Sequence, residues 1–171
     1  MRPRPPLAWA AAAALLGACG GCQRPAEEPS RPPEAHPGRG VKVPLAEGWS
    51  ARLGKEQSLA VGPAGRAVLR IDLRPGAAAS RPDAAELVRL FSSSFGSSTV
   101  ITTSMKDSDS VSWATFRLGG RDGGTDEPAA MLGAKVLGED LFLCATLPGA
   151  TAAEVESALK ACEGISYSAG P

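Results

Sequence analysis

Residues 130–147 read AMLGAKVLGEDLFLCATL, and this stretch decides the fold. Two runs of strand-forming residues, 130–137 and 141–147, flank the tripeptide Gly138-Glu139-Asp140. A short loop with glycine between two such runs is typical of a β-hairpin, whose strands are antiparallel neighbours. We therefore expect an antiparallel sheet built around this hairpin.

Further runs of strand composition lie on the N-terminal side of the hairpin. In the run 66–73, Leu69, Ile71 and Leu73 occupy every second position, so that one face of the strand is apolar. The other runs are 41–43, 49–53, 57–61, 99–105 and 111–118.

Two amphipathic helices are also expected. The first begins at Ser80-Arg81-Pro82-Asp83, where Ser80 can cap the helix and proline is tolerated in the first turn. Its apolar stripe consists of Ala84, Leu87, Val88, Phe91 and Phe95, followed by Gly96. The second begins with Thr151 and Glu154 as a capping box. Its inner stripe consists of Val155, Ala158, Leu159 and Cys162, followed by Gly164.

The order of these elements indicates the fold class. Strands outnumber helices and mostly follow one another through short turns, which predicts an α+β fold. We expect an antiparallel β-sheet of about 6–7 strands covered by two helices. A single domain over residues 41–168 accounts for these elements, and the sequence contains no internal repeat.

The N-terminus, MRPRPPLAWAAAAALLGACGGC, has the organisation of a secretory signal peptide. Arg2 and Arg4 precede an apolar run, 7–16, that is too short to cross a bilayer core of roughly 30 Å. Leu16-Gly17-Ala18-Cys19 then resembles a bacterial lipobox, in which signal peptidase II cuts before a cysteine that carries a diacylglycerol. The resemblance implies a signal peptide over residues 1–18 and lipidation of Cys19, with palmitate as a typical acyl group.

Other interpretations of Cys19 and Cys22 are weaker. A redox C-x-x-C motif normally opens a helix, which Gly20-Gly21 and the following prolines disfavour. A zinc site needs further ligands, and the chain has a single histidine. An ordinary secreted protein cut near Ala18 and a structural thiol are the remaining alternatives. Cys22 lacks an aliphatic residue at the lipobox position and is left as an odd thiol without an assigned role.

The lipobox resemblance also implies a location. Two or three acyl chains give stable anchoring to a membrane. Gly20, rather than aspartate, follows Cys19, and by resemblance this favours the outer membrane facing the periplasm if the host is Gram-negative. In a Gram-positive host the anchor would lie in the single cell membrane.

Residues 20–40 contain five prolines and mixed charges without apolar periodicity. We expect residues 19–40 to form a lipidated cysteine followed by a disordered tether. His36 lies in this tether, and a solvated linker histidine is expected there, since no other metal-ligand type clusters nearby.

The charge balance excludes two classes of partner. From Val41 onward the chain has 13 basic and 15 acidic residues. Nucleic-acid binding needs a basic patch, and a polybasic membrane surface needs clustered lysine and arginine. Neither is expected for this domain.

The domain opens with VPLAEGW at residues 43–49, which is similar to the proline and Gly-Trp start of PsbP-like domains. The expected order of elements across 41–168 also resembles that group of small α/β/α sandwiches. The family as a whole has no catalytic residues, so none is transferred to this chain. Its known members mostly bind other molecules or assist assembly, and the resemblance therefore implies a non-enzymatic role without a cofactor.

Cys144 lies in the run 141–147, and Cys162 lies on the inner stripe of the second helix. An even pair of cysteines in the oxidising envelope is normally bridged. We expect this disulfide to pin the C-terminal helix to the sheet and to stabilise the fold by roughly 3 kcal/mol. A redox-active pair is the alternative, although no local C-x-x-C motif supports it.

Other candidates for chemistry are weak. Asp107 opens an acidic turn that hints at calcium, but Ser112 and Leu118 stand where an EF-hand loop has glycine and glutamate. The domain has no histidine to activate a serine nucleophile, and no G-x-S-x-G motif occurs. Trp49 and Trp113 are weak candidates for a ligand groove, since tryptophan more often fills a core. We expect neither catalytic residues nor a metal site.

The sequence therefore favours a membrane-anchored envelope lipoprotein with a non-catalytic binding or assembly role, through an envelope protein partner or a small ligand. Two alternatives stay open. An envelope enzyme, such as a hydrolase, would need a pocket lined by carboxylates with shifted pKa values. A small-molecule carrier would need an apolar cavity near Trp49 or Trp113.

Overall fold

A computed structural model describes residues 40–54, 57–94, 99–119 and 130–168. The expected signal peptide, Cys19, Cys22 and the expected tether lie outside these residues, as do Phe95 and Gly96. The elements are β1 (Val41–Lys42), β2 (Trp49–Leu53), β3 (Ser58–Pro63), β4 (Leu69–Arg74), the 3-10 helix η1 (Ala78–Ser80), α1 (Ala84–Ser94), β5 (Thr99–Asp107), β6 (Val111–Gly119), β7 (Ala130–Leu137), β8 (Asp140–Thr146), α2 (Ala152–Glu163) and β9 (Ser166–Tyr167).

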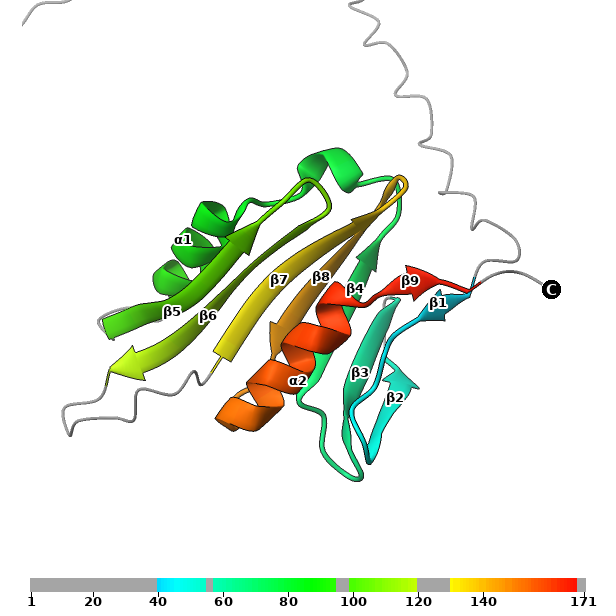
Figure 1. Cartoon of the computed structure of the whole chain (residues 1–171), viewed down its shortest axis with the longest axis horizontal. Helices are drawn as coiled ribbons and strands as arrows, with labels where there is room; N and C mark the ends of the chain where they lie inside the picture. Colours follow the sequence, from blue (N-terminus) through cyan, green and yellow to red (C-terminus); the bar gives the residue numbers. More distant parts are fainter. Residues whose placement is uncertain (1–39, 55–56, 95–98, 120–129, 169–171) are drawn as a thin grey trace, which may run out of the picture. The chain divides into compact units, whose positions relative to one another are not determined.

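Seven strands form one antiparallel sheet in the order β2-β3-β4-β8-β7-β6-β5 (Figure 1). The hairpin from which the sequence analysis started, β7–β8, lies in the middle of this sheet. Gly138 has a positive φ of 58° in its turn, a conformation that glycine adopts without steric cost. The predicted class, α+β with an antiparallel sheet and two helices, is confirmed.

The two helices lie on opposite faces of the sheet (Figure 1). Successive side chains of a strand point to opposite faces, and β7 shows this directly. Leu132 packs against the apolar cluster of α1, whereas the next residue, Gly133, faces the sulfur of Cys162 on α2. The sheet is therefore the middle layer of three.

The main core lies between the sheet and α2. Its fully buried members include Leu69, Ile71 and Phe142 from the sheet, together with Val155 and Ala158 from α2. A smaller core on the other face joins Phe91 of α1 to Ala114 and Phe116 of β6. The rings of Phe91 and Phe116 are stacked, with centroids 4.0 Å apart.

The start of α1 differs from the sequence prediction. Ser80 belongs to η1 and does not cap α1, which begins at Ala84. Arg81 is extended because the following Pro82 restricts its backbone, and this separates η1 from the helix. Asp83 takes the capping role: its carboxylate accepts a hydrogen bond from the backbone N–H of Glu86 at 2.7 Å.

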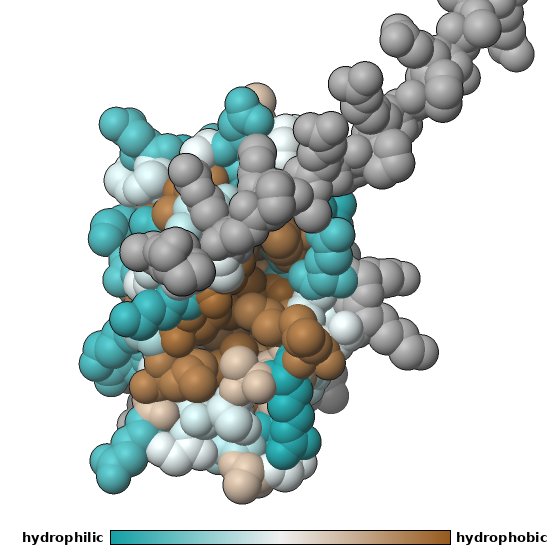
Figure 2. All heavy atoms as spheres, turned by 90° about the vertical axis from the view of Figure 1, so that its right-hand side faces the viewer, coloured by the Kyte–Doolittle hydropathy of each residue, from teal (hydrophilic) through white to brown (hydrophobic). Residues whose placement is uncertain are grey.

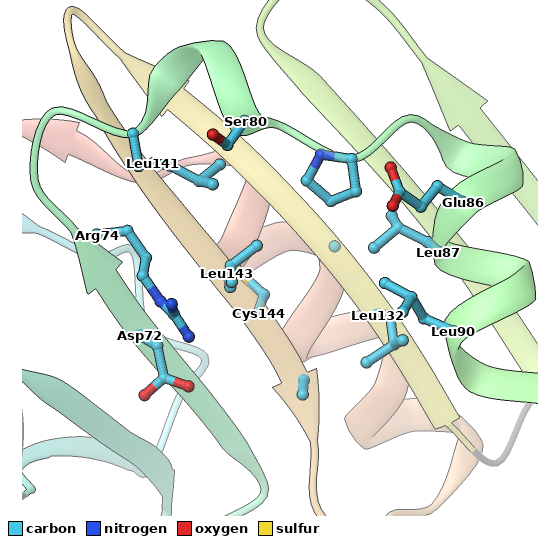
Figure 3. A pocket seen from close by; sticks show the side chains of 14 residues that line it. Asp72, Arg74, Ser80, Glu86, Leu87, Leu90, Leu132, Leu141, Leu143 and Cys144 are labelled. Atoms are coloured by element: carbon cyan, nitrogen blue, oxygen red, sulfur yellow. The ribbon is translucent and has the colours of Figure 1, made fainter. Parts of the chain in front are cut away.

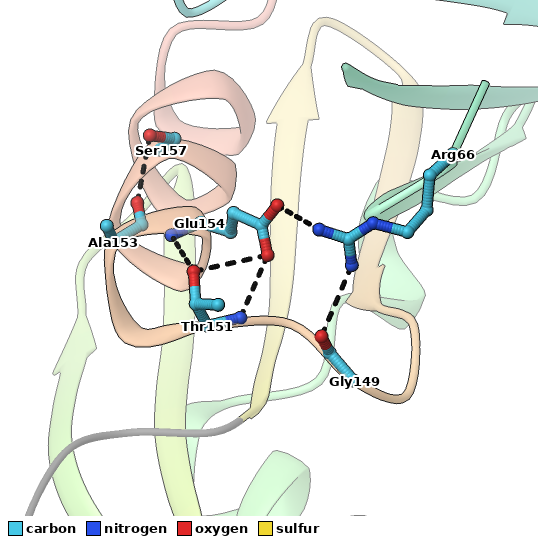
Figure 4. A network of polar contacts seen from close by, with 6 residues as sticks. All are labelled: Arg66, Gly149, Thr151, Ala153, Glu154 and Ser157. Carbon is cyan, nitrogen blue, oxygen red and sulfur yellow. Dashed lines mark hydrogen bonds and ion pairs between the residues drawn. The ribbon is translucent and has the colours of Figure 1, made fainter. Parts of the chain in front are cut away.

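The start of α2 agrees with the predicted capping box (Figure 4). The side chain of Thr151 accepts a hydrogen bond from the backbone N–H of Glu154, and the Glu154 carboxylate accepts one from the backbone N–H of Thr151. The same carboxylate pairs with Arg66, which also donates to the carbonyl of Gly149 at 3.2 Å. These bonds hold the pKa of Glu154 below its usual value, chiefly through the Thr151 N–H.

After α2 the chain forms β9, which pairs with β1 in a separate two-stranded sheet. This strand was not predicted. The hydroxyl of Tyr167 donates to the carboxylate of Asp140 at the tip of the β7–β8 hairpin, which fixes β9 against the sheet. Within the described residues, every helix lacks the length and apolar content that a membrane-spanning helix needs.

Candidate binding groove beside α1

The sheet is wider than the helix that covers it. Seven strands spaced about 4.8 Å apart span roughly 29 Å, whereas a helix with its side chains covers about 10–12 Å. α1 lies against β5, β6 and β7. In the described residues, β8 and β4 on this face lie beside α1 rather than beneath it, and the short helix η1 contacts β8.

A groove with a volume of about 480 Å³ follows this area of the sheet, and we call it the α1 groove (Figure 3). Leu87 and Leu90 of α1 form one wall, and Leu132 of β7 contributes to the floor. The rest of the floor comes from Gly133 of β7 and from four residues of β8: Leu141, Leu143, Cys144 and Ala145. The groove thus offers a mainly aliphatic surface of the size common for ligand sites.

Charged side chains border the groove on both sides. Along β4, Arg70, Asp72 and Arg74 alternate on the face of the groove, and the Arg70 guanidinium pairs with Asp72 at 2.8 Å. Asp72 and Arg74 line the groove, so one carboxylate lies between two arginines on this strand. On the opposite wall, Glu86 of α1 pairs with Arg89 at 3.2 Å.

The connection between β4 and α1 closes one end of the groove. Ala77, Ser80 and Pro82 line it there. The connection is fixed to the β7–β8 hairpin, because Gly76 N–H donates to the Asp140 carboxylate at 3.1 Å. The groove is therefore framed by elements that are hydrogen-bonded to the centre of the sheet.

The N-terminus of α1, which carries the groove wall, is held by Asp107 of β5. One carboxylate oxygen pairs with Arg81 at 2.9 Å, and the other accepts from the backbone N–H of Ala84 at 3.2 Å. These two bonds, led by the one from Arg81, lower the pKa of Asp107. Asp107, which opens the acidic turn of the sequence, thus positions the helix.

The two tryptophans that the sequence offers as ligand-groove candidates, Trp49 and Trp113, have different surroundings in the structure. Trp49 on β2 is partly buried against the main core. Trp113 on β6 donates through its indole N–H to Glu163 of α2 at 2.8 Å. Neither residue lines the α1 groove.

Glu163 is the centre of a small polar cluster at the C-terminal end of α2. It also pairs with Lys106 of β5 at 2.9 Å, and this bond is the main reason that its pKa is lowered. The indole bond from Trp113 acts in the same direction. The cluster ties α2 to β5 and β6, so it has a structural explanation.

Cys144 of β8 and Cys162 of α2 form a disulfide, in agreement with the pairing expected from the sequence. Their Cα atoms are 6.2 Å apart, within the usual range for a bridge. Both residues are only 2% exposed. Within the described ranges, no three His, Cys, Asp or Glu side chains gather as a metal site would require, and Cys19, Cys22 and His36 lie outside those ranges.

Sequence reasoning did not identify the groove residues. Two signals were present. Leu90 lies outside the predicted apolar stripe of the first helix, yet it is large and apolar. The strand LFLCATL is apolar at nearly every position, which indicates that both of its faces are covered. One of these faces is in fact only half covered, and Leu143 lies there, partly buried, in the groove.

Comparisons with known proteins add little. Neither a protein-family model nor a curated protein matches the chain. A crystal structure of a protein from Bacteroides thetaiotaomicron VPI-5482 is similar over 75% of this chain and 45% of that chain, with a TM-score of 0.33 and 13% sequence identity. The chain thus spans less than half the length of that protein.

Proposed function

We propose that this protein is a lipid-anchored envelope protein whose domain binds a segment of another envelope protein in the α1 groove. The anchor is supported by the lipobox resemblance at Cys19 and the proline-rich stretch that follows it. In a Gram-negative host, Gly20 after Cys19 favours an anchor in the outer membrane, with the domain in the periplasm.

The observation that carries the binding role is the groove itself. A leucine-rich floor between an exposed helix flank and a strand fits a row of apolar side chains, as in the docking of amphipathic segments into apolar grooves. Charges on both walls can pair with polar groups that flank such a row. Because the groove is partly open to solvent, it suits a chain segment better than a fully enclosed small molecule.

The polar groups around the groove support binding rather than catalysis. Each of its two carboxylates, Asp72 and Glu86, is paired with an arginine of its own element. Ser80 lines one end of the groove, and no histidine lies in the described part of the chain to activate it. The proposal therefore assigns these residues to recognition.

Site-specific photo-crosslinking in cells tests the proposal. A photoreactive amino acid is placed at Leu90, which is 45% exposed, and as a control at Leu45, which is 41% exposed and lies outside the groove. We expect a discrete protein adduct from position 90 and none of that mass from position 45. The adduct should decrease at least tenfold when Arg74→Glu and Leu143→Ser are introduced together, a change of about 1.4 kcal/mol or more.

Two results would contradict the binding role. Equal adducts from positions 90 and 45 would show non-specific contact, and an adduct that survives the groove substitutions would place the partner elsewhere. A small molecule retained in the groove of protein purified from the envelope would instead favour the carrier. Circular dichroism and thermal unfolding of each variant show whether the domain is intact.

A further inference from the structure

A second apolar surface lies far from α1 in the fold, at the corner of the sheet formed by β2, β3 and β4. It is a hollow of about 330 Å³, and we call it the corner hollow. It is lined by Val41, Leu53, Gln57, Leu59, Ile71, Leu73 and Phe142. Six of these seven side chains are hydrocarbon, and none of the described residues that line the hollow is charged. Lys55 and Glu56, between Leu53 and Gln57, lie outside the described residues.

The register explains why this corner is open. Leu53 lies opposite Leu59, Leu59 opposite Ile71, and Ile71 opposite Cys144, so these residues share the face that α2 covers. α2 itself contacts β7 and β8. The face therefore continues past the helix as an apolar surface, and Figure 2 shows it as a brown area bordered by hydrophilic side chains.

Leu53 is the most exposed large apolar residue in the described ranges. Its side chain is 87% exposed at the end of the edge strand β2. A single exposed leucine is ordinary on a protein surface, but one that borders an apolar hollow extends a patch of the kind that marks interaction sites. The patch is distinct from the α1 groove, whose walls carry charges.

The position of β1 indicates what would occupy the corner hollow. Val41, the first residue of β1, lines the hollow, so the described domain begins beside it. About 20 residues of coil have a root-mean-square length of roughly 25 Å. An anchored chain would hold the corner hollow near the bilayer at a high effective concentration, at which a small apolar contact is sufficient for docking.

We propose that the corner hollow and Leu53 are a membrane-docking surface that inserts into the same leaflet of the bilayer in which the chain is anchored. The hydrocarbon side chains among the described lining residues match lipid chains, which offer neither hydrogen bonds nor charges. This inference rests on the lipid anchor at Cys19 in the proposed function. Docking at this corner leaves the α1 groove, on the other face of the sheet, available for a protein partner.

The test uses the full lipidated chain in vesicles of phosphatidylethanolamine and phosphatidylglycerol that contain a spin-labelled lipid. Leu53→Cys, in a Cys22→Ser background, is labelled with an environment-sensitive fluorophore, and Leu90→Cys is the matched control. We expect strong quenching at position 53 and little at position 90. With the fluorophore moved to Lys42→Cys, Leu53→Asp should lower the ratio of docked to undocked protein about tenfold, and Leu90→Asp should not.

Each other outcome overturns the proposal in a recognisable way. Vesicle-bound protein with equal quenching at both positions shows an anchored domain without a docking surface. Position 53 could instead become shielded from solvent as the protein concentration rises, without quenching by the spin-labelled lipid. That result would assign the hollow to a second copy or to another protein. Loss of vesicle binding, with no palmitate on Cys19, overturns the anchor and the docking surface together, but it leaves the α1 groove to be judged by its own crosslinks.

Discussion

The two helical layers of this domain are attached to the same sheet by different means. α2 is joined to β8 by a buried disulfide, begins with a complete capping box and continues into β9. α1 has no disulfide within the described residues and is held by one stacked aromatic pair and by aspartates at its N-terminus. One layer is covalently fixed, and the other depends on packing.

This difference matches the positions of the two proposed contacts. The α1 groove lies beside the helix held by packing, where small shifts of Leu87 and Leu90 can adjust to a ligand. The stability of a protein is not uniform, and binding surfaces are commonly drawn from its less stable parts. The α2 layer forms the main core and keeps the sheet in place.

The largest expected effect tests whether one aromatic residue holds the α1 layer. Phe91→Ala removes a ring that is 8% exposed and stacked on Phe116. We expect the free energy of unfolding, from urea denaturation, to fall by about 3 kcal/mol. The control, Leu90→Ala on the exposed flank, should change it by only about 0.5 kcal/mol. A loss below that value for Phe91→Ala would mean that α1 is held by something else.

Removal of the disulfide tests the α2 layer. Cys144→Ala with Cys162→Ala frees two residues that are 18 positions apart. The chain-entropy model gives a loss of about 3 kcal/mol in unfolding free energy. We expect hydrogen exchange to increase in α2 and β9 more than in α1. Chemical reduction of the unmodified chain should have the same effect, whereas an unchanged melting temperature would contradict the role assigned to the bridge.

Gly133 tests how closely α2 approaches the sheet. A Cβ atom at this position would lie 3.2 Å from the Cys162 sulfur and 3.4 Å from the Met131 sulfur. Because the bridged sulfur cannot move away, Gly133→Ala should cost about 1 kcal/mol in a melting experiment. The same substitution without the disulfide should cost less. An equal cost in both backgrounds would assign the strain to the Met131 sulfur and the Cβ atom of Trp113, each 3.4 Å away.

The smallest expected effect is on the stability of the domain at acid pH. The pKa of Glu163 is lowered by its bonds to Lys106 and Trp113, so its stabilising contribution is complete at neutral pH and is lost as the pH falls below about 4. Glu163→Gln should therefore reduce the acid dependence of the melting temperature. Glu156→Gln, which breaks an exposed pair with Lys160 on the same helix, is the control and should have a smaller effect.

Local chemistry explains which elements could be predicted from sequence. The strand over 49–53, the hairpin over 130–147 and the Thr151 capping box all depend on residues close together in the chain. β9 is only Ser-Tyr, too short for a periodic pattern, and it exists because β1 pairs with it. The helix start at Ser80 was wrong because Asp83 competes as a cap and Pro82 extends the residue before it.

The candidate site could not be predicted because it is a product of tertiary placement. The groove exists only because α1 lies over β5, β6 and β7, and no local pattern states which strands a helix will cover. The position of β8 between β4 and β7 is likewise set by long-range pairing. The disulfide was within reach of sequence reasoning, since only two cysteines fall inside the expected domain.

The pairing of β1 with β9 has a mechanical consequence. The two strands share two residue pairs, and the chain reaches Gly40 beside Ser168, which donates a hydrogen bond to its carbonyl at 2.7 Å. Tension applied from the N-terminal side is carried first by this short ladder, which opens one residue pair at a time. The seven-stranded sheet bears load only after β1 has separated, so a pull through the proposed lipid anchor would open the β1–β9 pair before it reached the core.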